Sequence, residues 1–268
     1  MPLSISIGPL SLPTPVLLLL VSVALGLAVA RWVGRGQTPT ATDALLLIVL
    51  GALLVGRIIF VLRFADSYHT IWQMLDFRDR GIDPGAAVLA ALVLSAVQFR
   101  RYATLKKAML SGIVSTAVCF SAGSFWLHSQ QQQQVLANIT LETLSGYPVA
   151  LPDLAQGKPV VMNIWASWCP PCHREMPHLL AAEQLHPDVR FMLINLQENR
   201  ATVQEYLRKH QLHFGHVLLD TRGDVASYYG AQGVPATLFF NADGTLSSAH
   251  FGEVSKAILQ QGIAGAYQ

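Results

Sequence analysis

The segment Trp165–Pro177 reads WASWCPPCHREMP and holds two cysteines separated by two residues, with a histidine directly after the second. Two kinds of site share this pattern. A Cys-x-x-Cys pair can form a redox-active dithiol, whereas Cys-x-x-Cys-His is the sequence to which c-type haem is attached. Cys169, Cys172 and His173 fit both patterns. The residues around them must therefore decide between a dithiol and a haem site.

From about Val135 onward the sequence predicts strands and helices in alternation. The apolar run Val160–Trp165 is typical of a buried strand and leads directly into the cysteines. Apolar or alternating runs predict further strands at Ile139–Leu144, Val149–Leu151, Val189–Leu196, Val217–Asp220, Thr237–Phe240 and Leu246–Phe251. Helical periodicity is found at His173–Leu185, Ala201–His210, Val225–Tyr229 and Val254–Gly262. This order predicts an α/β domain with a mixed sheet flanked by helices.

An α/β domain favours the dithiol over the haem, because c-type cytochromes are mostly helical. A haem would need Cys169 and Cys172 as anchors, His173 as one axial ligand, and a second ligand such as Met176 or Met192. A zinc site would need a second cysteine pair, but Cys119 is single and far away in the sequence. We therefore expect neither a metal nor a cofactor.

The predicted strand, loop and helix assign a role to each cysteine. Cys169 lies at the N-terminus of the helix, where free N–H groups and the helix dipole stabilise a thiolate. Cys169 is therefore expected to be the nucleophile. Cys172, one turn into the helix, can resolve the mixed disulfide. Pro171 is tolerated in the first turn, and Pro177 is expected to kink the helix.

The domain resembles the thioredoxin superfamily, and within it the TlpA/ResA-type membrane-anchored thiol–disulfide oxidoreductases. The resemblance covers nearly all of Val135–Ile263. It is carried by Gly157-Lys-Pro-Val-Val161, Asn163-Ile-Trp-Ala-Ser-Trp-Cys-Pro-Pro-Cys172, Glu175-Met-Pro177 and Gly233-Val-Pro-Ala-Thr237. It implies a thioredoxin fold for this part of the chain.

The resemblance also implies roles for residues outside the cysteine pair. Pro235, after Val234, corresponds to the cis-proline beside the dithiol, where the backbone pairs with a substrate peptide. Trp168 is expected at the rim of the site, in contact with substrate, and Trp165 in the core. Glu175 corresponds to a glutamate beneath the dithiol and is expected to tune or relay the proton of Cys172; the alternative is a solvated surface glutamate.

One position departs from thioredoxin itself. Thioredoxin has a buried aspartate six residues before the first cysteine, and this chain has Asn163 there. An amide cannot accept a proton at neutral pH, which leaves Glu175 as the nearby acid. The imidazolium of His173 could further favour the Cys169 thiolate.

The first half of the chain has the composition of a membrane region. Hydrophobic residues make up 52% of the sequence and charged residues only 13%, well below the usual quarter. Four transmembrane helices are predicted. The third is short for a bilayer, and its alternative is a half-buried or re-entrant segment. They lie at about Pro15–Val33, Ala44–Leu62, Pro84–Val97 and Ala108–Leu127. The net charge of +2 and the lack of a basic run with aromatics argue against nucleic acid as a partner.

Lysine and arginine in the short loops predict the orientation. The loop 98–107 is the most basic, with Arg100, Arg101, Lys106 and Lys107, and is expected in the cytoplasm. Arg31 and Arg35 place the first loop on the same side. The loop from Arg63 to Asp83 mixes both signs and is expected outside, as are the N-terminus and everything after Leu127. Arg57, inside the second span, is expected to snorkel or to pair within the protein, and the alternative is a functional role.

These boundaries divide the chain into three segments. They are a transmembrane anchor at 1–128, a Gln-rich linker at 129–134 and a periplasmic thioredoxin-like domain at 135–268. Gly56–Leu62 and the loop to Gly85 also resemble the early part of prolipoprotein diacylglyceryl transferases. That family has a His-Gly-Gly motif where this chain has Arg80-Gly-Ile-Asp-Pro-Gly85, so no transferase residue is carried over.

The sequence thus predicts a multi-pass protein of the bacterial inner membrane that exchanges thiols and disulfides in the periplasm. Resemblance favours reduction of oxidised periplasmic proteins, apocytochrome c among them, with electrons from a DsbD/CcdA-like membrane donor. The alternatives are a disulfide oxidase or isomerase, a module that only docks a partner, a c-type haem protein and a lipid transferase.

Overall fold

The computed structural model describes residues 4–7, 10–36, 40–65, 81–131, 134–231 and 233–267. The chain forms two compact units, which are described separately. One is Pro15–Leu127, and the other is Met1–Thr14 together with His128–Gln268. Most of the loop expected outside the membrane, with Asp66, Asp76, Arg78, Asp79 and Arg80, lies outside the described residues.

The first unit is helical. Its helices are α1 (Thr14–Val33), α2 (Ala41–Arg63), α4 (Pro84–Arg101) and α5 (Lys106–Gln131), with a 3₁₀ turn at Ala103–Leu105 before α5. Among the described residues, three helices are long and apolar enough to cross a membrane: Thr14–Val33, Ala41–Arg63 and Ala103–Leu127. The 18-residue α4, which ends with Arg100 and Arg101, is not one of them.

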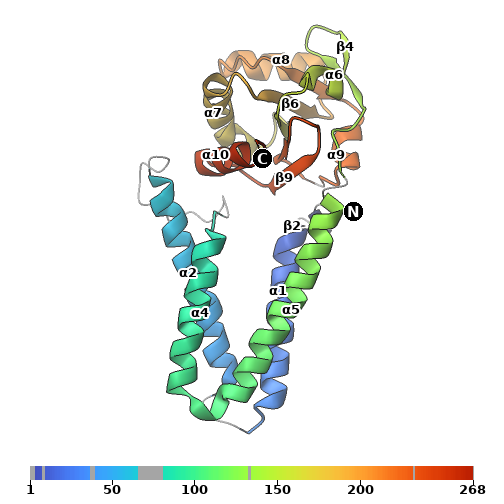
Figure 1. Ribbon diagram of the computed structural model, residues 1–268. Helices are drawn as coiled ribbons and strands as arrows, with labels where there is room; N and C mark the ends of the chain where they lie inside the picture. Colours follow the sequence, from blue (N-terminus) through green and yellow to red (C-terminus); the bar gives the residue numbers. More distant parts are fainter. Residues whose placement is uncertain are drawn as a thin grey trace. The chain divides into compact units, whose positions relative to one another are not determined.

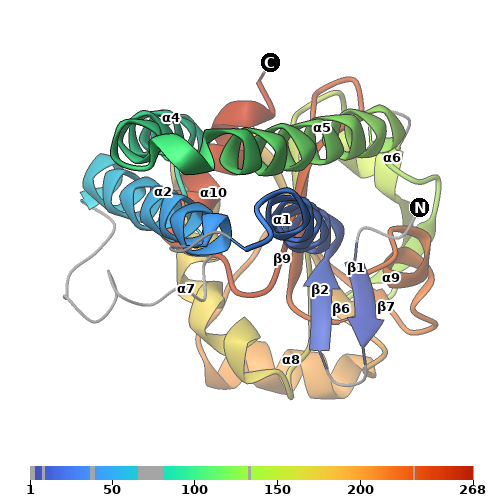
Figure 2. The ribbon, with the colours of Figure 1, turned by 90° about the horizontal axis from the view of Figure 1, so that it is seen from below.

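The helices of this unit lie side by side in pairs, α2 with α4 and α1 with α5 (Figures 1 and 2). Two glycines allow α1 and α5 to approach closely. A Cβ on Gly26 would lie 2.7 Å from the Gly112 carbonyl oxygen, and one on Gly112 would lie 2.9 Å from that of Gly26. The apolar core of the unit is formed where α1 ends and where α2 and α5 begin, around Ala30, Leu45 and Met109.

Arg57 is buried within this unit, with 3% of its surface exposed. Its Nη1 donates to the Gly81 carbonyl oxygen at 3.0 Å, and the guanidinium lies 5.9 Å from the centroid of the Phe60 ring. Of the two expected arrangements, the structure shows pairing within the protein.

The second unit contains a mixed sheet. Within the described residues it has seven strands in the order β4-β3-β7-β6-β5-β8-β9. Strands β5, β6 and β7 are parallel, and the pairs β3–β4, β3–β7, β5–β8 and β8–β9 are antiparallel. The strands are β3 (Thr140–Thr143), β4 (Pro148–Ala150), β5 (Val160–Trp165), β6 (Arg190–Leu196), β7 (Val217–Asp220), β8 (Ala236–Phe240) and β9 (Leu246–Phe251).

Helices flank this sheet, as the sequence predicts. They are α6 (Leu151–Ala155), α7 (Pro170–Leu185), α8 (Arg200–Lys209), α9 (Asp224–Tyr228) and α10 (Lys256–Gly265). The sequence did not predict the short α6, nor the antiparallel pair β1 (Ser4–Ile7) and β2 (Leu10–Pro13) (Figure 2). Residues 129–131 of the expected linker form the last turn of α5, and residues 132–133 lie outside the described residues.

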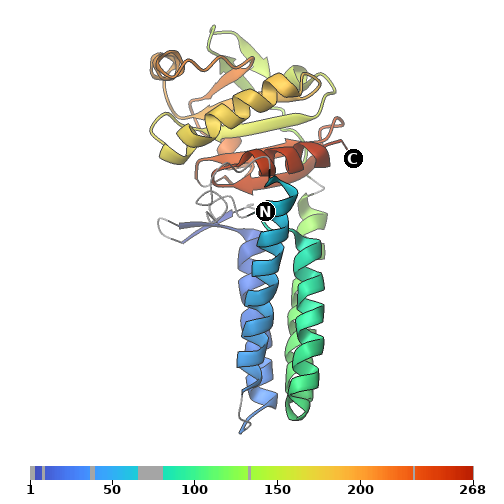
Figure 3. The same cartoon turned by 90° about the vertical axis from the view of Figure 1, so that its left-hand side faces the viewer.

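The sheet has an apolar core on each face, because successive strand residues point to opposite sides. From β5, Met162 and Ile164 join the core that is covered by α6 and α9. Val161 and Trp165 join the core that is covered by α7, α8 and α10. Figure 3 shows α7 and α10 on this second face.

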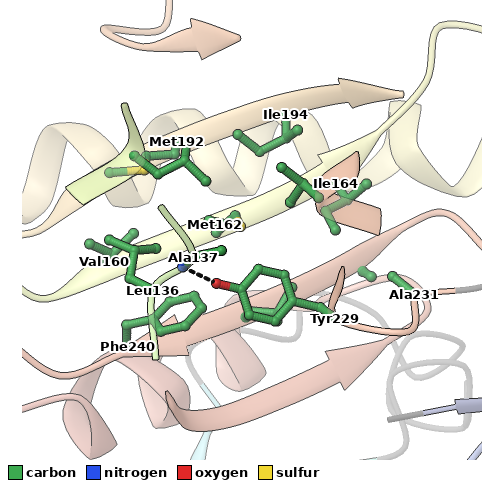
Figure 4. Packing of buried hydrophobic residues seen from close by; sticks show 14 of the residues in the cluster. Leu136, Ala137, Val160, Met162, Ile164, Met192, Ile194, Tyr229, Ala231 and Phe240 are labelled. Atoms are coloured by element: carbon green, nitrogen blue, oxygen red, sulfur yellow. Dashed lines mark hydrogen bonds between the residues drawn. The ribbon is translucent and has the colours of Figure 1, made fainter. Parts of the chain in front are cut away.

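Tyr229 ties the first core to the start of the domain (Figure 4). Its hydroxyl accepts a hydrogen bond from the Ala137 N–H at 2.8 Å and donates to the Val135 carbonyl oxygen at 3.1 Å. The ring packs edge-on against Phe240, with 5.6 Å between centroids. Burial raises the pKa of this phenol, so Tyr229 stays neutral and can both donate and accept.

Candidate active site

The two cysteines lie where β5 passes into α7, as the sequence predicts. Cys169 is the N-cap residue of α7, and the Cys172 N–H donates to its Sγ at 3.2 Å. Cys169 and Cys172 form a disulfide and are almost completely buried. Pro170 and Pro171 occupy the first two helical positions, where a missing N–H is harmless. A thiolate on Cys169 would therefore be stabilised by the first turn of α7.

The two tryptophans of the motif lie in different environments. Trp165 is completely buried under α7 and α8, whereas Trp168, next to Cys169, is 64% exposed. An exposed indole beside a reactive sulfur offers an incoming polypeptide a large apolar surface.

Glu175 lies one turn after Cys172 and is completely buried, which rules out the alternative of a solvated surface residue. Its Oε1 accepts from Asn163 Nδ2 at 2.8 Å, and its Oε2 accepts from the Val254 N–H at 2.9 Å. Burial raises the pKa of Glu175 to about 8, although the two hydrogen bonds act in the opposite direction. Such a carboxyl group can take up and release a proton near neutral pH.

Asn163 connects Glu175 to the neighbouring strand. It lies directly opposite Thr237 in the antiparallel pair of β5 and β8, and its Nδ2 is 3.0 Å from Thr237 Oγ1. Thr237 belongs to the motif Gly233–Thr237, but sequence reasoning gave it no role. Strand alternation could have revealed its place. Thr237 and Asn163 lie on the face of the sheet that is covered by α7, the helix that carries the cysteines.

Val234 and Pro235 directly precede β8, the strand that pairs with β5. The peptide bond between them is cis, the isomer that the family resemblance implies. Pro235 directly precedes β8, whose first residue Ala236 pairs with Ile164 near the end of β5. The Gly252 N–H donates to the Pro235 carbonyl oxygen at 2.9 Å. Val234 is partly buried and packs against both cores.

The loop before Cys169 is fixed by a carboxylate that the sequence did not indicate. Glu198 Oε2 accepts from the Ser167 N–H at 2.6 Å, and Oε1 forms a second hydrogen bond with the Ser167 hydroxyl. Asn195 Nδ2 donates to Glu198 Oε2 at 2.7 Å. The contact joins residues 31 positions apart, so no local pattern could reveal it.

His173 contacts the same loop. Its Nε2 lies 2.6 Å from the Ser167 carbonyl oxygen. Its ring packs against Tyr206, with 4.9 Å between centroids, and lies near His210. Ser167 is therefore bonded through its N–H, its hydroxyl and its carbonyl group. The expected effect of His173 on the Cys169 thiolate stays a prediction.

Comparisons with known proteins find relatives of the C-terminal half of the chain. A family model described as Redoxin matches residues 130–263. The thiol-disulfide oxidoreductase ResA of Halalkalibacterium halodurans is 32% identical over 126 residues, which cover 46% of this chain and 70% of that protein. The sporulation thiol-disulfide oxidoreductase A of Bacillus subtilis is 25% identical over 137 residues, 49% of this chain and 81% of that protein.

A solved structure is similar as well. The crystal structure of a secreted Mycobacterium tuberculosis disulfide oxidoreductase is 32% identical and covers 47% of this chain and 95% of its own, with a TM-score of 0.43.

Proposed function

Because the chain belongs to the Redoxin family, among thioredoxin-like thiol–disulfide oxidoreductases, we propose that it reduces disulfides of periplasmic proteins through Cys169 and Cys172. The observation that carries this proposal is the buried cysteine pair at the start of α7, one turn before the buried carboxyl group of Glu175.

The reaction transfers two electrons from the reduced cysteine pair to the substrate. The Cys169 thiolate attacks one sulfur of the substrate disulfide, the substrate S–S bond breaks, and the second substrate sulfur leaves as a thiolate that takes a proton from water. The Cys172 thiol then loses its proton to the Glu175 carboxylate and attacks Cys169 Sγ. The bond between Cys169 Sγ and the substrate breaks, the substrate sulfur leaves as a thiolate that takes the proton held by Glu175, and the Cys169–Cys172 disulfide is left behind.

Three further residues would bind the substrate polypeptide. The exposed ring of Trp168 supplies apolar contact area beside Cys169. Val234 and Pro235, next to the end of β5, would offer backbone groups to an extended peptide. This assignment rests on the resemblance to thioredoxin-like proteins and on the pairing of β8 with β5.

The membrane arrangement is also part of the proposal. We infer four transmembrane spans in the bacterial inner membrane, with the short α4 as the third along the chain, and a periplasmic C-terminal domain. The apolar helices support a membrane anchor, and the basic residues Arg100, Arg101, Lys106 and Lys107 support a cytoplasmic loop between α4 and α5. The likeness of Gly56–Leu62 to prolipoprotein diacylglyceryl transferases fits an anchor scaffold without transferase activity.

Oxidised periplasmic proteins, apocytochrome c among them, are the proposed substrates. The periplasm is oxidising, so a reductase there needs electrons from outside that compartment. A DsbD/CcdA-like membrane protein is the proposed donor.

The reduction potential of the cysteine pair tests the direction of electron flow. The full chain with Cys119→Ser, in detergent, is equilibrated with defined ratios of reduced and oxidised dithiothreitol, and free thiols are trapped with a maleimide. A value near that of thioredoxin, roughly −270 mV, is expected for a reductase. A value near roughly −120 mV would instead identify a disulfide oxidase.

The four-span topology has its own test. Single cysteines are placed at Lys106 and at Ser129 in a chain without other free thiols, and a membrane-impermeant maleimide is added to intact spheroplasts. Labelling at Ser129 and protection at Lys106 are expected. Labelling at both positions would contradict the cytoplasmic loop.

A further inference from the structure

Glu175 is held by two donors on opposite sides. Asn163 on β5 reaches Oε1, and the backbone of Val254, two residues before α10, reaches Oε2. The backbone donor is available whatever residue occupies position 254. The side-chain donor depends on the amide of Asn163. Removal of that amide would change the surroundings of the carboxyl group without touching either cysteine.

The Asn163 amide is fixed in the interior. The residue is 1% exposed, and Thr237 on the paired strand holds the same Nδ2 that contacts Glu175. Asn163 Oδ1 is buried and has no hydrogen-bond partner among the described residues. A buried polar atom without a partner lowers stability. An apolar residue at position 163 would avoid this loss of stability. The presence of an asparagine there points to a role for its amino group, which contacts Glu175 and Thr237.

The two ends of the amide also match the two protonation states of Glu175. The amino group, which donates to Glu175 Oε1 in this structure, can donate to a carboxylate. With the amide turned over, Oδ1 would take the place of Nδ2 and could accept from a protonated Glu175 and from the Thr237 hydroxyl. An aspartate in place of Asn163 would carry a charge of the same sign as ionised Glu175. An apolar residue could neither donate a hydrogen bond to the carboxylate nor accept one from the protonated carboxyl group.

We propose that Asn163 is a positioning residue that sets the pH at which Glu175 gives up its proton, and thereby the pH range in which Cys172 can resolve a mixed disulfide. This inference rests on the proposed function of the cysteine pair. It assigns to Asn163 a role in the proton transfer, although an amide itself cannot accept the proton at neutral pH.

The charged groups around Glu175 largely offset one another in their effect on its pKa. Arg174 on α7 and Glu253, beside Val254, have opposite effects on the carboxylate, and they form an ion pair with 2.6 Å between Arg174 Nη2 and Glu253 Oε2. β5 and β8 contribute the uncharged Asn163 and Thr237. Cys172, on the same face of α7, is held in the disulfide. The hydrogen bond from Asn163 therefore lowers the pKa of Glu175, against the effect of burial, with little interference from other charges.

The glutamates of the chain make a direct test practical. There are six, and all lie between Glu142 and Glu253. The full chain is labelled with ¹³Cδ-glutamate, kept oxidised in detergent micelles and titrated by NMR, and E175Q identifies the Glu175 signal. Asn163→Leu is expected to raise the midpoint of that signal by about one to two pH units, the usual size of a lost hydrogen bond to a charged group.

Two matched variants separate this effect from a general disturbance of the core. Asn195→Leu makes the same change on β6, at a completely buried residue whose amino group contacts Glu198 instead, and is expected to leave the Glu175 midpoint in place. Thr237→Val keeps the Asn163–Glu175 contact and is expected to shift the midpoint by less than half as much as Asn163→Leu. An unchanged midpoint in Asn163→Leu would overturn the inference.

If Asn163→Leu does not fold, the wild-type chain decides. The side-chain amide signals of ¹⁵N-labelled Asn163, assigned with the Asn163→Ser variant, are expected to move with the same midpoint as Glu175. Amide signals that stay constant through the Glu175 titration would overturn the inference.

A kinetic measurement connects the midpoint to the reaction. The pH profile of disulfide reduction is expected to shift upward in Asn163→Leu by the same interval as the Glu175 midpoint. An equal loss of rate at every pH would indicate a structural role only and would overturn the inference. A wild-type pair that does not exchange with dithiothreitol would instead contradict the proposed function.

Discussion

The two faces of the seven-stranded sheet use the same strand for different purposes. Met162 and Ile164 of β5 point into an apolar core under α6 and α9, whereas Asn163, between them, points toward α7 and contacts Glu175. The first face removes hydrocarbon from water and stabilises the domain. The second buries an amide, a carboxyl group and a hydroxyl group close to a reactive disulfide.

The polar groups of the second face lower the stability of the domain. A buried carboxyl group lowers stability as soon as it ionises. Asn163 Oδ1, which has no hydrogen-bond partner in the described part of the chain, lowers it further. The first face contains polar groups of another kind: the Tyr229 hydroxyl has both a donor and an acceptor as partners. Substitutions on the first face are therefore expected to change stability alone, and substitutions on the second to change reactivity and the pH dependence of stability.

The largest expected effect is that of Cys169→Ser on the second face. A serine hydroxyl is a far weaker nucleophile than a thiolate at neutral pH, so disulfide reduction should fall to background. Cys119→Ser, in α5 of the helical unit, is the matched control and should keep full activity. Reduction rates with a model disulfide check both variants. Disulfide reduction that survives Cys169→Ser would show that this cysteine is not the nucleophile.

Much of this contrast could be predicted from local sequence. The apolar run Val160–Trp165 coincides with β5, and Val217–Asp220 coincides with β7. Both strands are buried along their whole length, so most positions favour an apolar side chain, and the polar exceptions are Asn163 in β5 and Asp220 in β7. The cysteine pair at the start of α7 followed from the same pattern of strand, loop and helix.

The rest depended on contacts between distant residues. Asn163 and Glu175 are both visible in the motif, but the hydrogen bond between them requires α7 to lie on the odd-numbered face of β5. The Glu198–Ser167 contact joins two loops at neighbouring strand ends. The helix α6 has only five residues and directly follows β4, too short for a helical period to be recognised.

The second effect in size is the pH dependence of stability. The pKa of Glu175 is raised to about 8, above its value in the unfolded chain, so the folded state binds a proton that the unfolded state releases. Stability is fully present below about pH 4.5 and is lost as pH rises through about 8, by an amount on the order of 4–5 kcal/mol.

Glu175→Gln should remove that decline. Urea unfolding of the oxidised full chain, followed by tryptophan fluorescence between pH 5 and 9, is the measurement. Glu183→Gln, at a partly buried glutamate that accepts from the Gly215 N–H, is the control and should keep most of the slope. A wild-type stability that does not fall over this range would show that Glu175 is already ionised at pH 5.

Ile164→Ala tests the first face of the same strand. The side chain is completely buried, and its truncation leaves a cavity that should lower the free energy of unfolding by about 2–5 kcal/mol. The reduction potential of the cysteine pair should stay within the error of the measurement, since Ile164 points away from α7. A potential that moves with Ile164→Ala would show that the two faces are coupled through β5.

The smallest effect is expected at the edge of the second face, from Glu198→Gln. The carboxylate accepts from the Ser167 N–H and hydroxyl and from Asn195, whereas a glutamine keeps one acceptor oxygen and brings an amino group against these donors. Trp168, one residue after Ser167, would then be less firmly placed, and reduction of a protein disulfide should slow by up to about tenfold, the equivalent of one charge-assisted hydrogen bond. Reduction of a small disulfide that cannot reach Trp168 should change less, and the ratio of the two rates is the measurement. An equal loss with both substrates would mean that Glu198 acts on the cysteines themselves rather than on the surface that receives the polypeptide.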